Sequence, residues 1–337
     1  MTIELQESFP SPELQRSTTP RYDLNHDELG YLTAKFLQEK HDQIPRVGDY
    51  ACIRVHGSSE YANLGRTVEG IVFTQDLNEN PEDMQVEFAP YEDKSWFFVV
   101  VDKKQKQPVG NLRVIENGPN GFMALNELVG LPHANDSLLD ATFTVDGFFK
   151  DYKINPVTTW EVSTIATLPE NRRSAHDNNL SLVPLTTEEK AAEATKQHIT
   201  SGLLYRALYA GAVANGIEHF VAIIDIDAYG KLRNLGIPFY KIFDMLPKEY
   251  IDNNTRFQPS VANVSDFGTE MRGYADWKIN EAKARLVQMG LSGDAHEAAK
   301  NAADRGVQRA MGKRALIEEL LTGPKLDHMF AQEHKIS

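Results

Sequence analysis

The sequence contains one cysteine among its 337 residues, so an intramolecular disulfide is excluded. It has no run of 18 apolar residues, which is about the length that a membrane-spanning helix needs. Its first residues, MTIE, have neither the basic nor the apolar region of a secretory signal peptide. We therefore expect a cytoplasmic protein with no membrane span.

Positive charge is scarce, since 35 Lys and Arg stand against 48 Asp and Glu and give a formal net charge of -13. Neutralising nucleic-acid phosphates needs clustered Lys and Arg, so we expect no nucleic-acid partner. The ten histidines show no pairing at metal-ligand spacing and there is no cysteine cluster, so no metal is predicted. Cys52 lies in an apolar segment, where a lone cysteine is usually a small buried hydrophobe.

Hydrophobic residues make up 41% of the chain, which is enough for a full core and one large domain. Residues 1–20 contain three prolines and several Ser and Thr, a composition typical of a disordered leader. From 266 to 337 the pattern is helical, Ala-rich and broken by glycines. The predicted division is a leader over 1–20, a domain over 21–265 and a helical C-terminal appendage over 266–337.

The first half of the domain reads as short elements separated by turns. The predicted elements are a helix over 23–44, strands over 46–56 and 67–74, a polar loop over 76–93, a hairpin of strands over 95–102 and 108–115, a short helix over 123–129 and a strand over 141–148.

The segment from 158 to 241 is the most informative part of the chain. A strand over 159–168 ends at Pro169, which cannot donate a ladder hydrogen bond, so pairing should stop or splay there. A loop containing Arg172 and Arg173 follows, then a long helix from about 186 to 215. The run HFVAIID over 219–225 predicts a strand in the centre of the sheet, and a short helix closes before Gly236. Two strands that part near Leu168 would leave a V-shaped slot with unpaired main-chain groups.

This order resembles the acyl-thioester cradle of the GNAT acyltransferases. Residues 160–166, WEVSTIA, look like the Glu-x-Ser-Arg-hydrophobic-Ala strand of the acyl-homoserine-lactone synthases and long-chain N-acyl amino acid synthases. The hairpin over 95–115 is similar to the family's central hairpin, which ends in Gly-x-x-Arg, and KLRNLG over 231–236 is similar to its short helix. The resemblance covers about residues 90 to 262. It implies an α+β, three-layer fold with a mixed, mostly antiparallel central sheet flanked by helices.

The chain also departs from the patterns that it resembles. Thr164 stands where the lactone synthases have arginine, which puts lactone synthesis in doubt. The acetyl-CoA enzymes have a Gly-rich pyrophosphate turn and a tyrosine general acid, whereas this chain has NRRSA over 171–175 and Leu232. A pantetheine donor that relies less on the nucleotide, such as an acyl carrier protein, therefore becomes a candidate beside acyl-CoA.

Amide synthesis from a thioester needs a base for the amine proton and donors for the oxyanion. Glu161 is the candidate base, because a carboxylate in mid-strand between Trp160 and Val162 is unusual and partial burial would raise its pKa. The alternative is a solvent-facing carboxylate or an ion pair with Arg113. Ser163 and Thr164 are candidates for orienting substrate or water, although such hydroxyls often only satisfy strand neighbours.

The remaining candidates concern binding. Backbone amides over Ile165, Ala166, Thr167 and Leu168 are the expected oxyanion and donor contacts. Arg172 and Arg173 lie where the acetyl-CoA enzymes bind phosphate, or are simply solvated. Arg113, in the Gly-x-x-Arg pattern, is a candidate for a substrate carboxylate or lactone oxygen, with a surface ion pair as the alternative. Trp160 is included as a substrate contact.

Together these features predict an N-acyltransferase that moves an acyl group from an acyl-carrier-protein or acyl-CoA thioester to the amine of a small molecule such as an amino acid. A GNAT-fold binding or scaffolding protein without catalysis, and an ordinary acetyltransferase, stay open as alternatives. The C-terminal helices either pack on the domain or on a homodimer partner, or dock a carrier protein.

Overall fold

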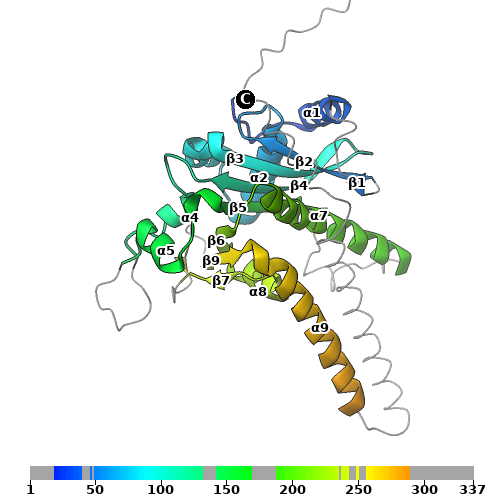
Figure 1. Ribbon diagram of the computed structural model, residues 1–337. Coiled ribbons are helices and arrows are strands. Elements are labelled where there is room, and N and C mark those ends of the chain that lie inside the picture. Colours follow the sequence, from blue (N-terminus) through cyan, green and yellow to red (C-terminus); the bar gives the residue numbers. More distant parts are fainter. Residues whose placement is uncertain are drawn as a thin grey trace, which may run out of the picture.

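A mixed β-sheet forms the centre of the chain in the computed structural model (Figure 1). The structure describes residues 19–39, 46–47, 49–131, 142–168, 187–234, 237–242, 248–249 and 256–288. The strands are β1 (Arg46–Val47), β2 (Tyr50–His56), β3 (Ser95–Asp102), β4 (Gln107–Glu116), β5 (Thr159–Thr167), β6 (His219–Asp225), β7 (Tyr240–Lys241), β8 (Lys248–Glu249) and β9 (Arg256–Asn263).

The order of the strands across the sheet is β1-β2-β3-β4-β5-β6-β9-β7, and β8 also pairs with β9. Among the described strands, β5 and β6 form the one parallel pair, and all other neighbours are antiparallel. The parallel pair needs a long crossover connection, and the longest described helix of the chain lies in it. The predicted α+β class, with a mixed and mostly antiparallel sheet flanked by helices, is confirmed.

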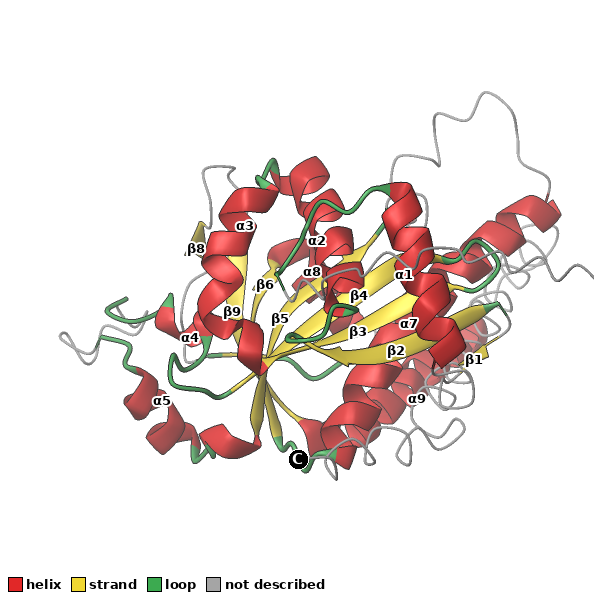
Figure 2. Cartoon of the chain, turned by 90° about the horizontal axis from the view of Figure 1, so that it is seen from above, coloured by secondary structure: helices red, strands yellow, loops and turns green. Residues whose placement is uncertain are grey.

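Helices cover both faces of this sheet. They are α1 (His26–Glu39), α2 (Ala62–Leu77), α3 (Pro81–Phe88), α4 (Met123–Asn126), α5 (Val145–Tyr152), α7 (Thr187–Ala214), α8 (Ile226–Asn234) and α9 (Val264–Gln288), with short 3-10 turns η1 (Ala89–Lys94) and η2 (Pro156–Thr158). Figure 2 shows α1 and α2 in front of the strands, and the hydrophobic clusters place α7 and the start of α9 against the opposite face.

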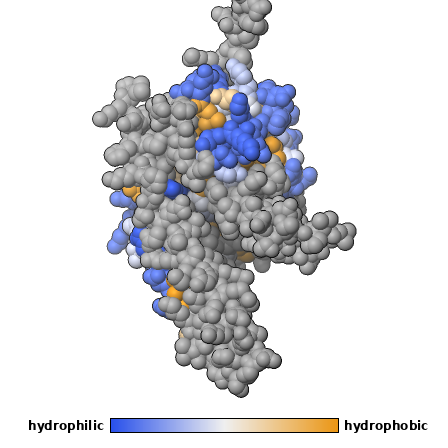
Figure 3. All heavy atoms as spheres, turned by 90° about the vertical axis from the view of Figure 1, so that its right-hand side faces the viewer, coloured by the Kyte–Doolittle hydropathy of each residue, from blue (hydrophilic) through white to orange (hydrophobic). Residues whose placement is uncertain are grey.

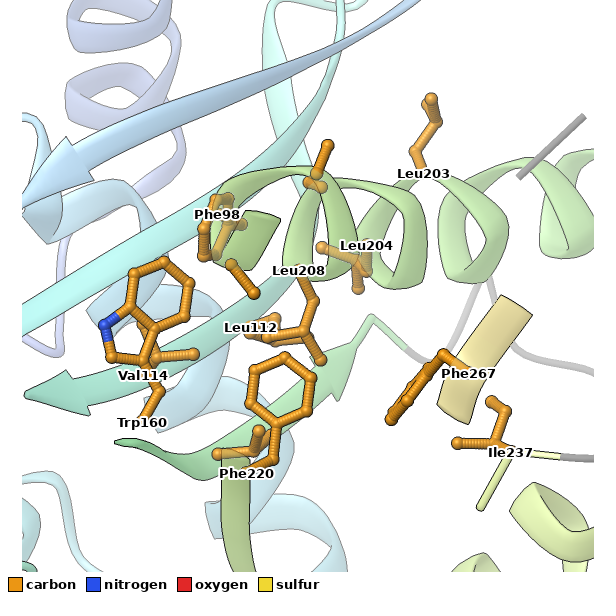
Figure 4. Packing of buried hydrophobic residues seen from close by; sticks show 14 of the residues in the cluster. Phe98, Leu112, Val114, Trp160, Leu203, Leu204, Leu208, Phe220, Ile237 and Phe267 are labelled. Atoms are coloured by element: carbon orange, nitrogen blue, oxygen red, sulfur yellow. The ribbon is translucent and has the colours of Figure 1, made fainter. Parts of the chain in front are cut away.

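Two helices approach the sheet at glycines. A side chain at Gly65 of α2 would place its Cβ 2.6 Å from the Asn111 side chain, and one at Gly211 of α7 would place it 2.8 Å from the Phe98 ring. The α7 face packs on a large core that Phe98 and Trp160 join, shown in Figure 4. Close approach on both sides fixes the middle of the sheet, where the elements of the candidate site meet.

Several predicted elements are confirmed with small shifts in their ends. These are the helix now seen as α1, the strands β2, β3, β4, β5 and β6, and the long helix α7. Three predictions were wrong. Residues 67–74 lie within α2, the supposed loop over 76–93 contains α3 and η1, and the strand expected over 141–148 is replaced from Val145 by α5.

The predicted leader and most of the predicted appendage lie outside the described residues. Residues 1–18 and 289–337 are in this group. The first helix expected in the appendage corresponds to α9, which begins at Val264, two residues before the predicted boundary. In Figure 1, α9 starts beside the sheet and runs away from it. The domain boundaries therefore stay predictions.

No helix among the described residues combines the length and apolarity needed to cross a membrane. On the side of the molecule drawn in Figure 3, the described surface is mainly hydrophilic, with smaller apolar patches between the polar ones.

Candidate active site

The strands β5 and β6 part soon after they meet. Their parallel pairing runs from Thr159 opposite His219 to Glu161 opposite Val221 and goes no further. Beyond that point β6 follows β9 as far as Asp225, while β5 follows β4. The sheet therefore opens into a V whose apex is at Glu161.

The predicted slot exists, but its predicted position was wrong. The parting was expected at Leu168 and Pro169, whereas the structure places it after Glu161. Leu168 is still attached to the neighbouring strand, since its N–H donates to the Val109 carbonyl at 3.1 Å. Pro169 lies outside the described residues. The stretch of β5 along the open edge is consequently longer than the sequence suggested.

A β-bulge shapes the start of this edge. Arg113 of β4 is opposite Thr164, but Val114 is opposite Val162, so Ser163 is the extra residue on β5. A bulge re-aims the side chains next to it and increases the local twist. The register places the bulge at Ser163, two residues beyond Glu161.

A cleft of about 640 Å³ fills the V. One wall is β5, the other is β6, and α7 and α2 close the sides. The lining residues are Val72, Phe73, Asp76, Leu77, Val162, Ser163, Thr164, Ile165, Thr167, Ser201, Tyr205, Leu208, Ala222, Ile223, Ile224, Asp225, Ala228, Leu232, Ile237, Phe239, Phe257 and Phe267. The cleft is mainly apolar and lies within the size range of small-molecule sites.

Main-chain groups are available at the open edge of β5. Since the Leu168 N–H points at β4 and successive residues of a strand direct their peptide groups to alternate sides, Ile165 directs its N–H and C=O away from β4. Ile165 has no pairing partner on β6 and its side chain is 40% exposed. The edge can therefore hydrogen-bond an extended ligand as a further strand would.

A second, smaller cavity of about 100 Å³ adjoins the cleft at the bulge. Its lining comes from β5, from the first turn of α4, and from α2, α3 and the link between them. The residues are Phe73, Leu77, Glu79, Glu87, Phe88, Met123, Ala124, Glu161, Val162, Ser163, Thr164, Ile223 and Phe257. Residues 162–164 line both the cleft and this inner cavity, as do Phe73, Leu77, Ile223 and Phe257, so the two spaces adjoin at the bulge and at the side chains that face it.

Glu161 is fully buried at the apex of the V and lines the inner cavity. Its Oε2 accepts the Ala124 N–H at 2.9 Å, a contact that caps α4, because Phe122 at the N-cap offers no side-chain bond. Its Oε1 has no hydrogen-bond partner among the described residues. Burial raises the pKa of Glu161 to about 7, against the opposing effects of the Ala124 N–H, the Ser163 hydroxyl, the Met123 backbone and the charge of Arg113. A carboxyl that titrates near neutral pH can act as a general base.

The two hydroxyls after Glu161 differ in their contacts. The Ser163 hydroxyl is near enough to Glu161 to lower the pKa of that carboxyl but makes no well-aligned hydrogen bond in the described part of the chain, and Ser163 lines both spaces, so the hydroxyl can contact a ligand. The Thr164 hydroxyl instead donates to the buried carboxylate of Glu69 on α2. This bond ties the bulge to α2, and Thr164, the other candidate hydroxyl residue, also lines both spaces, so its expected role at the site stays a prediction.

Arg113 lies in a buried ion-pair cluster and not at the site. Its Nη2 is 2.6 Å from Glu69 Oε2 with both side chains fully buried, it donates to the Tyr22 hydroxyl at 2.7 Å, and Nη1 is 3.5 Å from Glu92. These neighbours hold the pKa of Arg113 above its usual value. The guanidinium also lies over the Phe88 ring at 3.9 Å. Neither the expected substrate contact nor the alternative surface ion pair describes this residue.

Trp160 is also in the core. Its side chain is fully buried, packs near the Phe98 ring at a centroid distance of 6.2 Å, and lines neither the cleft nor the inner cavity (Figure 4). The expected substrate contact is therefore replaced by packing under α7. Side chains alternate along a strand, so Trp160, next to Glu161, faces the opposite side of the sheet. Glu161 therefore lines the inner cavity while Trp160 lies in the core.

The expected donor-binding segment, residues 165–168, also alternates between the two faces of the sheet. Ile165 and Thr167 line the cleft, while Ala166 and Leu168 pack in a cluster with Val68 and Val72 of α2. Arg172 and Arg173, the candidate phosphate contacts, lie outside the described residues. Their assignment stays a prediction.

Sequence reasoning missed two carboxylates, Glu69 and Glu79. Glu69 orients the bulge through Thr164, and Glu79 lines the inner cavity. Both belong to the region that was predicted as strand and loop. The spacing of four between Leu64, Val68 and Val72, all buried on α2, is the helical signal that would have placed Glu69 on the inner face of a helix.

No protein-family model matches the chain, and no curated protein matches it in sequence. Solved structures do resemble it. They include BjaI, a CoA-dependent acyl-homoserine lactone synthase, with SAM and isopentyl-CoA (11% identity, 66% of this chain, 87% of that chain, TM-score 0.38). Another is FeeM, an N-acyl amino acid synthase from uncultured soil microbes (13% identity, 67% and 96%, TM-score 0.37). A third is the ribosomal-protein-S5-alanine acetyltransferase of Vibrio fischeri (12% identity, 66% and 98%, TM-score 0.31).

Proposed function

We propose that the protein is an N-acyltransferase that transfers an acyl group from a pantetheine thioester to the amine of a small molecule. The observation that carries this proposal is the position of Glu161, a buried carboxyl with one unpartnered oxygen, at the apex of a V between parted strands. One space beside the apex suits a thioester, and the other suits an amine.

The donor would lie in the cleft along β5. A pantetheine arm is an extended chain with two amide groups, and an unpaired strand edge offers amide donors and acceptors at matching spacing. Ile165 supplies such groups here. The cleft of about 640 Å³ also has apolar walls from α7 and β6 that an acyl chain can contact.

The acceptor amine would approach from the inner cavity. Its nitrogen attacks the thioester carbonyl carbon, a C–N bond forms, the C–S bond breaks, and the thiolate leaves. Glu161 takes the proton that the amine loses, and this proton then passes to the thiolate, so the carboxylate is regenerated and the products are an amide and a thiol. The carboxyl titrates at about 7, which leaves a large ionised fraction at neutral pH.

CoA and an acyl carrier protein are both candidates for the carrier of the acyl group. They share the pantetheine arm that the cleft would hold and differ in what lies beyond it. The missing acetyl-CoA turn and Leu232, in place of the tyrosine, favour a donor bound mainly through its pantetheine arm. Expected binding of phosphate by Arg172 and Arg173 would favour CoA.

Thiol release measures the reaction directly. The protein is mixed with acyl-CoA thioesters of 2 to 16 carbons, or with the same acyl groups on a carrier protein, together with a panel of small amines. We expect amine-dependent thiol release that falls by about 10² to 10⁴ in Glu161→Gln, the usual contribution of a general base. Glu82→Gln, an exposed residue of α3 outside both cavities, is the matched control.

The result separates the proposal from its alternatives. Undiminished turnover in Glu161→Gln would remove that residue from the mechanism. Thioester binding without thiol release for any amine would indicate a binding protein of this fold. A preference for the two-carbon donor would indicate an ordinary acetyltransferase.

A further inference from the structure

The inner cavity is lined by carboxyl groups and by no described cationic side chain. Glu79, Glu87 and Glu161 contribute carboxyls to its lining, and none of its described lining residues is Lys, Arg or His. The cleft adds Asp76 and Asp225 and, among its described residues, again no basic side chain. A ligand carboxylate bound here would meet like charges from these residues, whereas a ligand cation would meet opposite ones.

A second observation points to a ligand with a donor group. Glu161 Oε1 and Ser163 Oγ are both buried and both belong to residues that line this cavity, and neither makes a well-aligned hydrogen bond in the described structure, although the Ser163 hydroxyl is near enough to lower the pKa of Glu161. Leaving a buried polar atom unpaired is costly, and for a charged group the cost is larger. An amine or ammonium in the cavity would supply the missing donors.

Glu79 provides a further anionic group in the same cavity. It lies in the link between α2 and α3, and it is half-buried. Burial raises the pKa of Glu79 to about 7, and the negative charges of Glu87 and Asp83 act in the same direction. A cation beside Glu79 would relieve this repulsion and favour the ionised carboxylate.

The size of the cavity limits the length of the ligand. A cavity of 150 Å³ can hold the six carbons of benzene, so the inner cavity of about 100 Å³ holds about four heavy atoms. Four heavy atoms inside the cavity, with the reacting nitrogen and its carbon at residues 162–164 on the border of the cleft, make up the six heavy atoms of an unbranched four-carbon diamine.

We propose that the acceptor is a short aliphatic diamine, of which one amino group is acylated beside Glu161 while the second, as an ammonium, pairs with Glu79. This inference rests on the proposed N-acyl transfer and names the class of its acceptor. It replaces the amino acid that the sequence suggested, because Arg113, the residue expected to bind its carboxylate, is enclosed by Glu69 and Glu92.

The acceptor preference is measured by thiol release with three amines of four carbons each: 1,4-diaminobutane, butylamine and 4-aminobutyrate. They present an ammonium, a methyl group and a carboxylate, respectively, at the far end. We expect kcat/KM for the diamine to exceed that for butylamine by about tenfold, the effect of one partly buried charge pair, and that for 4-aminobutyrate to be lower still.

Glu79→Gln tests the residue. In this variant the ratio of kcat/KM for diaminobutane over butylamine should fall about tenfold, to near one. Glu82→Gln, which removes an exposed carboxylate of α3 outside the cavity, should keep the wild-type ratio. A ratio unchanged in Glu79→Gln, or a preference of the wild type for 4-aminobutyrate, would overturn the proposal while leaving N-acyl transfer intact.

Calorimetry with 1,4-diaminobutane and no thioester provides a readout that does not need turnover. Binding to the wild type that weakens in Glu79→Gln but not in Glu82→Gln supports the diamine site. If such binding is seen but no amine releases thiol, the proposed reaction is refuted and the diamine site is kept. No detectable diamine binding to the wild type, together with no diamine turnover, would overturn this inference.

Discussion

Replacing Glu161 by glutamine should make the protein more stable at alkaline pH while it removes the base. The wild-type carboxyl is fully buried, with one oxygen bonded to the Ala124 N–H and the other unpaired. Glutamine keeps an acceptor for that N–H and carries no charge into the interior. Its amide can donate to the Ser163 hydroxyl, which also has no partner within the described residues.

The magnitude follows from the pKa of the buried carboxyl. Burial raises it from 4.5 to about 7, and each pKa unit is worth about 1.4 kcal/mol, so ionising Glu161 costs the folded state about 3 kcal/mol. Since the folded pKa lies above the unfolded one, the folded state holds the proton more tightly. The stabilisation that the protonated Glu161 carboxyl gives the folded state is therefore fully present below pH 4.5, and it is lost as the pH rises from 4.5 through 7.

Urea unfolding of both proteins at pH 5 and at pH 8.5 measures this difference. We expect a gap between Glu161→Gln and the wild type that grows by about 2.5 kcal/mol in favour of the variant on going from pH 5 to pH 8.5. Glu82→Gln, which changes an exposed side chain, should show no such growth. A gap that is the same at both pH values would refute the assignment of a raised pKa to Glu161.

The same titration should govern the reaction. Because the base must be ionised, kcat/KM should rise with pH through about 7 and then level off. A rate that falls over this range would contradict the role of Glu161 as base.

Three further changes test other parts of the structure. Arg113→Met should lower the free energy of unfolding by about 3 to 5 kcal/mol in urea titrations, because it leaves buried carboxylates unpaired, and a loss below about 1 kcal/mol would contradict the buried cluster. Ser201→Trp places an indole in the cleft and should raise KM for the thioester by about tenfold. Val213→Trp, at a site 49% exposed on the same helix, should leave KM unchanged. Equal KM values for the two variants would refute the cleft as the donor site. Thr164→Val should lose about 1 to 2 kcal/mol of stability and Ser163→Ala about 0.5 kcal/mol or less, since only the first hydroxyl has a bonded partner, and the reverse order in thermal or urea unfolding would contradict these contacts.

Local patterns predicted the elements that carry the candidate site. The alternation before Pro169, the apolar run over 219–225 and the long helix between them were readable because each depends on the periodicity of its own segment. Glu161 was found for the same reason, since a carboxylate stands out between apolar residues of a strand. These predictions needed no contact between distant parts of the chain.

The position of the slot depends on a distant pairing. The opening after Glu161 arises because β9 pairs with β6 along its whole length and so directs it away from β5. Residues 256–263 follow β5 by about ninety positions, and nothing within β5 announces this pairing. Proline at 169 was a reasonable but local signal, and it placed the parting too late.

The partners of Arg113 were hidden for a similar reason. They come from Tyr22, Glu69 and Glu92, which lie on separate elements and are distant in sequence. The helix that carries Glu69 was itself misread, because the β-branched residues of 67–74 favour a strand when they are taken alone. Packing of Val68 and Val72 against the sheet overrides that preference.

A crystal structure of the protein with a thioether analogue of an acyl-CoA tests the central claim most directly. The account predicts the pantetheine arm between β5 and β6, hydrogen-bonded to the main chain at Ile165, with the atom that replaces the thioester carbonyl beside Ser163 and Glu161. A pantetheine arm bound elsewhere, with the V between the strands left as it is, would contradict it.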